Sequence, residues 1–305
     1  MASGRQFFGI RRVAAKVQLL ATKTKPKRID LEVMDGSIHT FLLKGREDLR
    51  LDEQIMQLLQ VVNAIATADT SASTLAAVQG PLFCSPPVPV RCRDYDVVPI
   101  GPRAGLIRWL QAVPLFSIHK MRRQCLHAQR ADKVGEDKKH LIVESSTDVW
   151  HRKVQQNLRS MGIDPNKAPR KNWPQEALRK TFDEMQADSP ADLLSRELML
   201  ASLNPSEHFV RSTAITLSMA MMSVLGHVVG LGDRHLDNIL LDLATGEVVH
   251  VDYSLCFDRG ARLKVPERVP FRLTRCMVAA LGPLGIAGLF HQTMVACLTL
   301  VREWR

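Results

Sequence analysis

Hydrophobic and polar residues alternate along several short runs in the first third of the chain, and alternation of this kind predicts strands. The predicted strands are residues 17–20, 29–33, 39–44, 95–99 and 105–110. Between the third and fourth runs, apolar residues recur at helical spacing over residues 53–63. A stretch rich in Ala, Ser, Thr and Pro, residues 66–93, is predicted as a loop. The pattern therefore indicates an antiparallel sheet with one helix over residues 1–110.

Helical spacing dominates the rest of the chain. The predicted helices are residues 114–130, 150–161, 175–185, 193–203 and 213–229. The last of these is almost wholly apolar, but Ser, Thr and His residues interrupt it, so we expect a buried core helix rather than a segment that spans a bilayer. A short apolar run, residues 248–251, predicts one more strand. An α+β fold is expected, with a mainly helical part over residues 111–305.

Candidate chemistry is concentrated in residues 230–242. Asp233, His235 and Asn238 lie within six positions, and the strand that follows ends on Asp252. Phosphoryl transfer needs a carboxylate beside the attacking hydroxyl, with an Asn and a second carboxylate to hold Mg²⁺. The five positions from Asp233 to Asn238 equal the spacing in ordinary protein kinases, although there the His precedes the Asp. The alternative is a polar loop that only caps a helix.

A second cluster supports the phosphoryl-transfer interpretation. Lys44 ends the third predicted strand and is followed by the carboxylates Glu47, Asp48, Asp52 and Glu53. A Lys on a strand beside a nucleotide binds its phosphates and needs a carboxylate to hold it in place. A carboxylate in the first turn of a helix, as Asp52 would be, is favoured by the helix dipole. The alternative is an ion pair on the surface.

These motifs resemble the phosphatidylinositol 3-kinase-related protein kinases (PIKKs). The resemblance rests on Asp-Arg-His-x-x-Asn after Gly-Leu-Gly, on His-x-Asp-Tyr at 250–253, and on Phe-Leu-Leu-Lys-Gly-x-Glu-Asp-Leu-Arg-x-Asp-Glu at 41–53, and it runs from about residue 22 to about residue 285. It implies a two-lobed kinase fold, with a phosphate loop, ATP lysine and hinge in residues 1–110. The catalytic loop (230–242) and the activation loop (252–274) would lie in the helical lobe.

The resemblance also implies roles for single residues. Asp233 would accept or orient the proton of the substrate hydroxyl, His235 would stabilise charge on the transferred group, and Asn238 and Asp252 would bind Mg²⁺ or Mn²⁺. Lys44 would hold the phosphates of ATP, paired with Asp52, and Glu47 is the weaker candidate for that pairing. The other expected ATP-binding residues are Thr22, Thr24, Leu42, Tyr95, Trp109, Leu110, Leu240 and Val251. Trp109 would stack on adenine, although its spacing alone fits a core residue better.

Two departures place the chain within the family. It has Leu236-Asp237 where most members have Pro-Ser, and Tyr253-Ser254 where most have Phe-Gly. Together with Thr-Lys-Thr-Lys-Pro-Lys at 22–27, they resemble the branch that acts in nonsense-mediated mRNA decay. That resemblance implies Ser or Thr followed by Gln as the target, in an RNA helicase. Ser254 would restrict the backbone, because Gly adopts positive φ and Ser resists it.

Composition adds limits to this picture. The 305 residues carry a net charge of +10, but the basic residues are dispersed and aromatic residues make up only 5%, so we do not expect direct nucleic-acid binding. No signal peptide or membrane span is expected, and six Cys without a Cys-x-x-Cys pair indicate reduced thiols. We expect a cytoplasmic protein, with the nucleus as a second location.

Two other functions stay open at this stage. One is a phosphoinositide lipid kinase, although 258–264 is only mildly basic; the other is a catalytically weak scaffold of the same fold. The family's C-terminal FATC element and its helical repeats have no counterpart in the sequence. A fragment of a larger protein or a truncated product is therefore expected, and regulatory subunits would bind through those absent regions.

Overall fold

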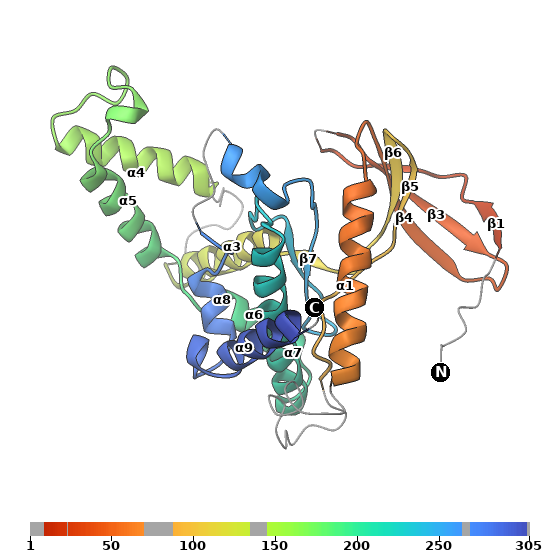
Figure 1. Ribbon diagram of the computed structural model, residues 1–305. Helices are drawn as coiled ribbons and strands as arrows, with labels where there is room; N and C mark the ends of the chain where they lie inside the picture. Colours follow the sequence, from red (N-terminus) through yellow and green to blue (C-terminus); the bar gives the residue numbers. More distant parts are fainter. Residues whose placement is uncertain (1–8, 23, 70–87, 135–144, 264–268, 304–305) are drawn as a thin grey trace.

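A computed structural model describes residues 9–22, 24–69, 88–134, 145–263 and 269–303 (Figure 1). An antiparallel sheet occupies one side of the molecule and helices occupy the other, so the α+β prediction is confirmed. The strands of this sheet are β1 Ile10–Val13, β2 Gln18–Leu19, β3 Lys27–Val33, β4 Ile38–Gly45, β5 Val97–Gly101 and β6 Ala104–Arg108. Their order is β1-β3-β4-β6-β5, with β2 also paired to β3.

The register of this sheet fixes which side chains share a face. Leu42 lies opposite Ile107, and Lys44 lies opposite Gly105. Directly opposed residues of paired strands point the same way, so Leu42, Lys44 and Ile107 share one face. The same face meets the beginning of α1, because a Cβ added at Gly105 would lie 2.7 Å from the side chain of Leu49, the residue before α1.

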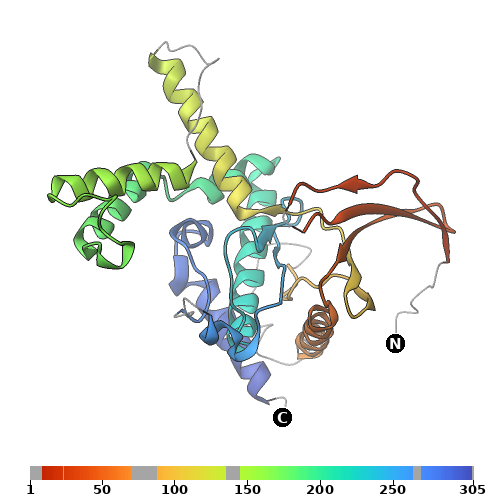
Figure 2. The same cartoon turned by 90° about the horizontal axis from the view of Figure 1, so that it is seen from above.

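Helix α1 (Arg50–Asp69) lies between the sheet and the helical part (Figures 1 and 2). It packs against β5 on one side and α9 on the other. It begins earlier and ends later than the predicted 53–63, and thus takes in the first residues of the predicted loop. Residues 70–87 of that loop lie outside the described residues.

The chain leaves the first sheet after Arg108 and enters a second, three-stranded antiparallel sheet at Val113. The strands of this second sheet are β7 Val113–Pro114, β8 Ile239–Leu241 and β9 Val248–His250. The predicted catalytic loop thus leads into β8, and Asp252 follows β9. Asn238 therefore lies directly before the hairpin β8–β9, and Asp252 lies directly after it.

Seven helices make up the rest of this part, within the residues that the structure describes. They are α3 Leu115–Val134, α4 Ser146–Ser160, α5 Gln175–Asp188, α6 Leu193–Ala201, α7 Pro205–Val228, α8 Arg275–Ala280 and α9 Leu289–Glu303. Short 3₁₀ turns occur at Arg170–Asn172, Phe257–Arg262 and Gly285–Ala287. Every predicted helix of this part has a counterpart.

Helix α7 is the central helix of this part. It is capped by Asn204, whose side chain accepts a hydrogen bond from the backbone N–H of Glu207. By length and composition α7 could cross a membrane, but 83% of its most apolar 18-residue window is buried inside the protein. The prediction of a buried core helix is therefore confirmed.

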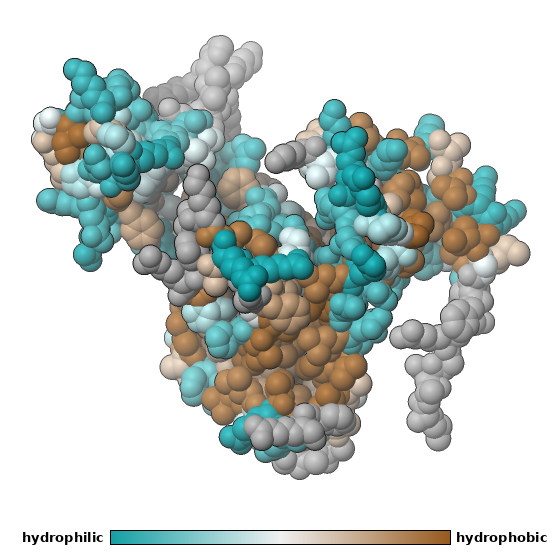
Figure 3. All heavy atoms as spheres, turned by 45° about the horizontal axis from the view of Figure 1, so that its top comes forward, coloured by the Kyte–Doolittle hydropathy of each residue, from teal (hydrophilic) through white to brown (hydrophobic). Residues whose placement is uncertain are grey.

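Helices α4 and α5 form an arm that projects from the body (Figures 1 and 2). The arm has a small core of its own, made by Val154, Leu158 and Ala177, with Trp150 and Trp173 packed against it. Its surface is mainly hydrophilic, whereas a broad hydrophobic surface covers part of the body in the same view (Figure 3). The two helices of the arm are therefore packed against each other through this small core.

Candidate active site

The catalytic loop begins with a glycine that the local geometry requires. Gly230 has φ +59°, and a Cβ there would lie 2.4 Å from the backbone oxygen of Phe257. The loop runs beside the segment after Asp252, because the N–H of Gly232 donates to Leu255 O at 2.8 Å and that of Phe257 to Val229 O at 2.6 Å. Two segments that are separate in sequence are thus joined within a few residues of Asp233 and Asp252.

Asp233 and His235 are presented to solvent at the end of this loop. Their side chains are 49% and 51% exposed. The backbone below them is held, because Asn238 Nδ2 and the N–H of His235 both donate to Asp233 O, at 3.0 and 2.9 Å. Asp233 has φ +56°, which Asp tolerates better than most residues. A fixed backbone with an exposed carboxylate suits a group that must meet a substrate hydroxyl.

The His235 ring lies between two carboxylates. Its Nε2 is 3.9 Å from Asp233 Oδ2, and its Nδ1 is 3.9 Å from Asp237 Oδ2. Asp237 is a residue that the sequence interpretation did not include in the site. Its only signal was its position two residues after the His.

The backbones that carry Asn238 and Asp252 are joined by a hydrogen bond. The N–H of Val251 donates to Asn238 O at 3.0 Å, which brings the end of the catalytic loop against the residue before Asp252. The amide nitrogen of Asn238 is bound to Asp233 O, so its side-chain oxygen is the atom left for a cation. One amide and one carboxylate oxygen suit Mg²⁺, which takes its remaining ligands from phosphates and water.

Asp252 is prepared to be an anion. Burial alone would raise the pKa of Asp252, but hydrogen bonds from Ser254 and the charges of Lys44 and Arg234 outweigh burial, so the pKa is lowered. The N–H of Ser254 donates to Asp252 Oδ1 at 3.2 Å. The positive φ of this segment, +63°, falls on Asp252 itself. Ser254 does not have positive φ, so the expected restriction at Ser254 does not arise in this conformation.

Arg234, buried and unassigned in the sequence interpretation, connects the two loops. Its guanidinium donates to Gly232 O and Val251 O, both at 2.8 Å, and to Asp252 O. Burial lowers its pKa, and the ring of Tyr253 lies 5.9 Å from it. One side chain therefore fixes the backbones that carry Asp233 and Asp252. Arg234 is part of the Asp-Arg-His motif, but its hydrogen-bond partners are backbone carbonyl groups, which a sequence pattern does not identify.

In the structure Lys44 pairs with Glu47, the weaker of its two predicted partners, and not with Asp52. Lys44 Nζ forms its ion pair with Glu47 Oε2, at 3.0 Å. Asp52 is buried in α1, and its Oδ1 instead accepts the N–H of Tyr253 at 3.1 Å. Burial raises the pKa of Asp52, and Lys44 lies near enough to oppose that effect. Lys44 and Glu47 are three residues apart, so their ion pair is local in the sequence. Asp52 instead links α1 to Tyr253, the residue after Asp252.

Half-buried apolar side chains lie beside these polar groups. Leu110, Leu240 and Val251 pack against the same core as Ile107, and Ile107 lies opposite Leu42 in the sheet. These side chains come from the sheet, from the segment after it and from the hairpin β8–β9, and they meet at one core. Apolar side chains of this kind suit contact with a flat ring such as adenine.

The remaining predicted ATP-binding residues are in varied surroundings. Tyr95 is buried, and burial together with Asp52 raises the pKa of its hydroxyl. Trp109 is half-buried, with the guanidinium carbon of Arg28 4.9 Å from its ring centroid. Thr22 and Thr24 are exposed in the turn between β2 and β3. Their roles toward ATP stay predictions. Of the activation loop, residues 264–268 lie outside the described residues.

The chain is similar to known proteins in both sequence and fold. The family of phosphatidylinositol 3- and 4-kinases matches residues 38–304. The chain is 35% identical to a probable serine/threonine-protein kinase smg1 of Dictyostelium discoideum over 96% of its length, and 36% identical to the serine/threonine-protein kinase SMG1 of Danio rerio over 97%. It covers only 14% and 8% of those two relatives.

Other relatives and solved structures agree. The serine/threonine-protein kinase TOR of Arabidopsis thaliana is 32% identical over 93% of the chain and is covered to 10%. Among solved structures, the FAT and kinase domain of CtTel1 matches 98% of the chain with a TM-score of 0.74 and 25% identity, and 18% of that chain is covered. The sheet and the helical part are thus arranged as in a kinase domain of known structure.

Proposed function

Because the chain belongs to the phosphatidylinositol 3- and 4-kinase family, and its named relatives are serine/threonine-protein kinases, we propose that it transfers the γ-phosphoryl group of ATP to Ser and Thr hydroxyls of proteins. The observation that carries the proposal is one set of contacts. The hydrogen bond from Val251 to Asn238 joins the backbones of the two proposed metal ligands, Asn238 and Asp252, and Asn238 is also bonded to the backbone of Asp233, whose carboxylate is exposed.

The proposed chemistry assigns one task to each group. Asp233 accepts the proton of the attacking hydroxyl, or holds that hydroxyl in line with the phosphorus. Lys44 binds the phosphates of ATP, and its ion pair with Glu47 holds its ammonium group on the inner face of the sheet. His235 stabilises charge that builds up on the transferred group.

Asn238 and Asp252 would hold Mg²⁺ or Mn²⁺. The lowered pKa of Asp252 keeps its carboxylate ionised, which a metal ligand requires. When bound, the ion neutralises negative charge on the phosphates. Arg234 and Asp52 would not touch the substrate; they hold the backbone of Asp252 and Tyr253 in place.

The substrate proposal is narrower. Relatives named SMG1, together with Leu236-Asp237 and Tyr253-Ser254, support a kinase of nonsense-mediated mRNA decay that acts on Ser-Gln or Thr-Gln in an RNA helicase. Such a role fits a location in the cytoplasm and also in the nucleus. Regulatory subunits would bind through parts of a longer protein, since the chain spans about a tenth of its curated relatives.

A peptide assay tests this function. Purified chain is incubated with radiolabelled ATP, Mg²⁺ or Mn²⁺, and a peptide that contains Ser-Gln or its Ser-Ala counterpart. Label on the Ser-Gln peptide alone supports the proposal. Phosphoinositide in lipid vesicles is offered in parallel, and label in the lipid without label in either peptide would establish a lipid kinase instead. Bound nucleotide without transfer to any acceptor would indicate a scaffold.

A further inference from the structure

An apolar groove of about 420 Å³ lies in the helical part, outside the nucleotide-binding residues. Its walls come from the start of α3, from α5 of the arm, from α6 and from the start of α8. The apolar side chains that line it include Leu115, Ile118, Leu194, Leu236, Leu273 and Met277. The groove is larger than one leucine side chain needs.

The groove is continuous with the catalytic loop. Leu236 follows His235 directly, its side chain lines the groove, and its backbone oxygen accepts the N–H of Phe116 at 3.1 Å. Leu273 and Thr274, at the end of the activation loop, form another part of the wall. A polypeptide with its hydroxyl at Asp233 would therefore lie within a few residues of this groove.

The lining of the groove includes basic residues but no acidic ones. Arg275, at its wall, donates to the backbone oxygens of Gln186 and Ser189, and the described part of the chain places no carboxylate within ion-pair distance of it. The nearby Asp192 is paired with Arg196 instead. Among the described residues, the hydrogen-bond partners of Arg275 are thus carbonyl oxygens and not carboxylates.

His119 lies in the same positively charged surroundings. It lines the groove, and its ring lies 3.2 Å from the hydroxyl of Ser189. Burial lowers the pKa of His119, and the charges of Arg123 and Arg275 lower it further. An apolar cavity with an unpaired cation suits an apolar side chain that has a carboxylate beside it.

One wall residue has an unusual exposure. Phe182, on α5, lines the groove and is nevertheless 52% exposed. A half-exposed aromatic ring at the mouth of an apolar cavity is common where a partner side chain enters. It also offers a position at which the groove can be changed without disturbing the core.

We propose that this groove is a docking site for the protein substrate, and that it takes an apolar residue next to an acidic residue at a fixed distance from the phosphorylated hydroxyl. The proposal rests on the proposed function, since the substrate is chosen as the occupant because the groove adjoins the catalytic loop. It assigns a recognition element outside the phosphorylated Ser-Gln or Thr-Gln pair.

Direct binding without ATP tests the proposal independently of catalysis. Fluorescein-labelled peptides keep a central Ser-Gln and carry a Leu-Asp pair moved one position at a time on either side. Ala-Asp and Leu-Lys versions serve as matched peptides. Anisotropy is expected to show, at one spacing, binding of Leu-Asp about tenfold tighter than of Ala-Asp, and tighter than of Leu-Lys. No gain at any spacing would overturn the proposal.

Variants of the chain test whether the tighter binding of the Leu-Asp peptide arises in the groove. Phe182→Asp should abolish this gain in affinity, whereas Phe209→Asp, at a similarly exposed Phe (48%) on α7, should keep it. Gln186→Glu adds a carboxylate to the groove and should weaken Leu-Asp more than Leu-Lys. A gain that survives Phe182→Asp would contradict the docking site, and melting temperatures near that of the unchanged chain show that each variant is folded.

Two further outcomes are decisive. Docking without phosphorylation of any peptide would leave the groove assignment standing and refute the proposed function. A dimer detected by sedimentation, and broken by Phe182→Asp, would place a second copy of the chain in the groove and overturn the substrate as its occupant.

Discussion

Glu47 and Asp52 have different roles, of which sequence interpretation predicted only one, the pairing with Lys44. Glu47 holds Lys44, and Asp52 accepts the N–H of Tyr253 from inside α1. Both residues follow Lys44 within eight positions, so sequence alone ranks them by family resemblance. The two roles call for different chemistry, because an ion pair needs charge and a hydrogen-bond acceptor does not.

Substitutions at Asp52 should therefore depend on shape rather than charge. Asp52→Asn keeps an oxygen that can accept the N–H of Tyr253, and kcat should stay within about threefold of the unchanged chain. Asp52→Ala leaves that buried N–H without a partner and should cost about 2 kcal/mol of stability, with a clear loss of kcat. The measurements are peptide phosphorylation and urea unfolding. Equal loss in both variants would mean that the charge of Asp52 is what matters.

Glu47→Gln should act on nucleotide binding instead. The ion pair is partly exposed, with side chains 20% and 34% accessible, so its removal should raise KM for ATP only several-fold. The KM for peptide and the melting temperature should change little. A matched Glu53→Gln variant, in the first turn of α1, should leave KM for ATP unchanged. An unaltered KM for ATP in Glu47→Gln would contradict the observed pairing.

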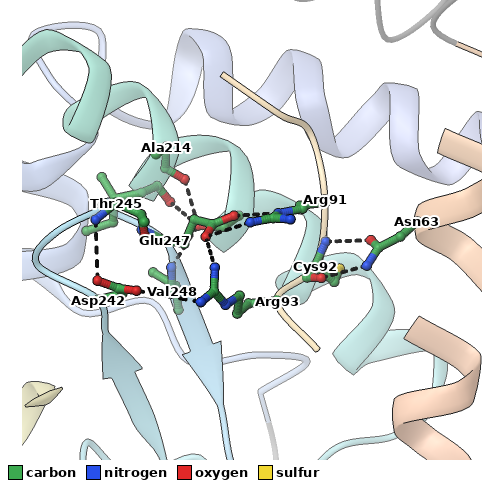
Figure 4. A network of polar contacts seen from close by, with 11 residues as sticks. Asn63, Arg91, Cys92, Arg93, Ala214, Asp242, Thr245, Glu247 and Val248 are labelled. Atoms are coloured by element: carbon green, nitrogen blue, oxygen red, sulfur yellow. Dashed lines mark hydrogen bonds and ion pairs between the residues drawn. The ribbon is translucent and has the colours of Figure 1, made fainter. Parts of the chain in front are cut away.

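At the scale of elements, the hairpin β8–β9 is tied to the segment that precedes β5. Glu247, 4% exposed, accepts from Arg91 Nε at 2.7 Å and from Arg93 Nη1 at 2.6 Å (Figure 4). Between these arginines, Cys92 exchanges two 2.8 Å hydrogen bonds with Asn63 of α1. The segment 91–93 therefore connects α1 to the hairpin that carries Asn238 and Asp252.

This connection predicts a pH dependence of stability. Burial alone would raise the pKa of Glu247, but the hydrogen bonds and charges of Arg91 and Arg93 outweigh it and lower that pKa. Because the folded pKa is depressed, the stabilisation is present above the ordinary pKa of 4.5 and is lost as the pH falls through the folded value.

Glu247→Gln should cost about 2 kcal/mol of unfolding free energy at pH 7, and that difference should shrink below pH 4.5. Urea unfolding at several pH values measures it. Glu32→Gln, which removes an exposed pairing of β3 with Arg11 and Arg12, is the control and should cost far less. A difference for Glu247→Gln that stays constant from pH 7 to pH 3.5 would contradict the assignment.

Elements were predictable where the sequence itself carries a strand-like or helical pattern of apolar residues. The strands β3 and β4 and helices α4 to α6 follow their patterns, with boundaries shifted by a few residues. Strand β1 was missed because all four of its residues are exposed, so no alternation marks it. Helix α7 begins at Pro205, well before the apolar run. The prediction missed its first turns because they are largely polar. In these turns the buried Arg211 donates hydrogen bonds to Ala244 O and to Glu207 Oε1.

At the scale of the whole molecule, the candidate site is assembled from both parts of the chain. Lys44 comes from the sheet, whereas Asn238 and Asp252 come from the hairpin of the helical part. The motifs identified these residues, but the contacts that bring them together, through Arg234 and Asp52, join segments up to 201 positions apart. Separations of that size leave no local signal in a single sequence.

A nucleotide that contacts both parts should stabilise the whole chain. A non-hydrolysable ATP analogue with Mg²⁺, at 100 times its Kd, should add about 2.7 kcal/mol to the unfolding free energy. Differential scanning fluorimetry should show a rise in Tm that Lys44→Met and Asp252→Asn both reduce. A rise that is equal in all three proteins would mean that the nucleotide binds elsewhere.

The most direct test of the central claim is single-turnover transfer of label from radioactive ATP to a Ser-Gln peptide by the unchanged chain and by Asp233→Asn. Asn tolerates the positive φ at this position, so the loop should keep its shape, and the Tm rise with nucleotide should be unchanged. The account predicts that Asp233→Asn loses about 10²- to 10⁴-fold in the rate of transfer. A transfer rate equal to that of the unchanged chain would show that Asp233 is not the group that activates the hydroxyl.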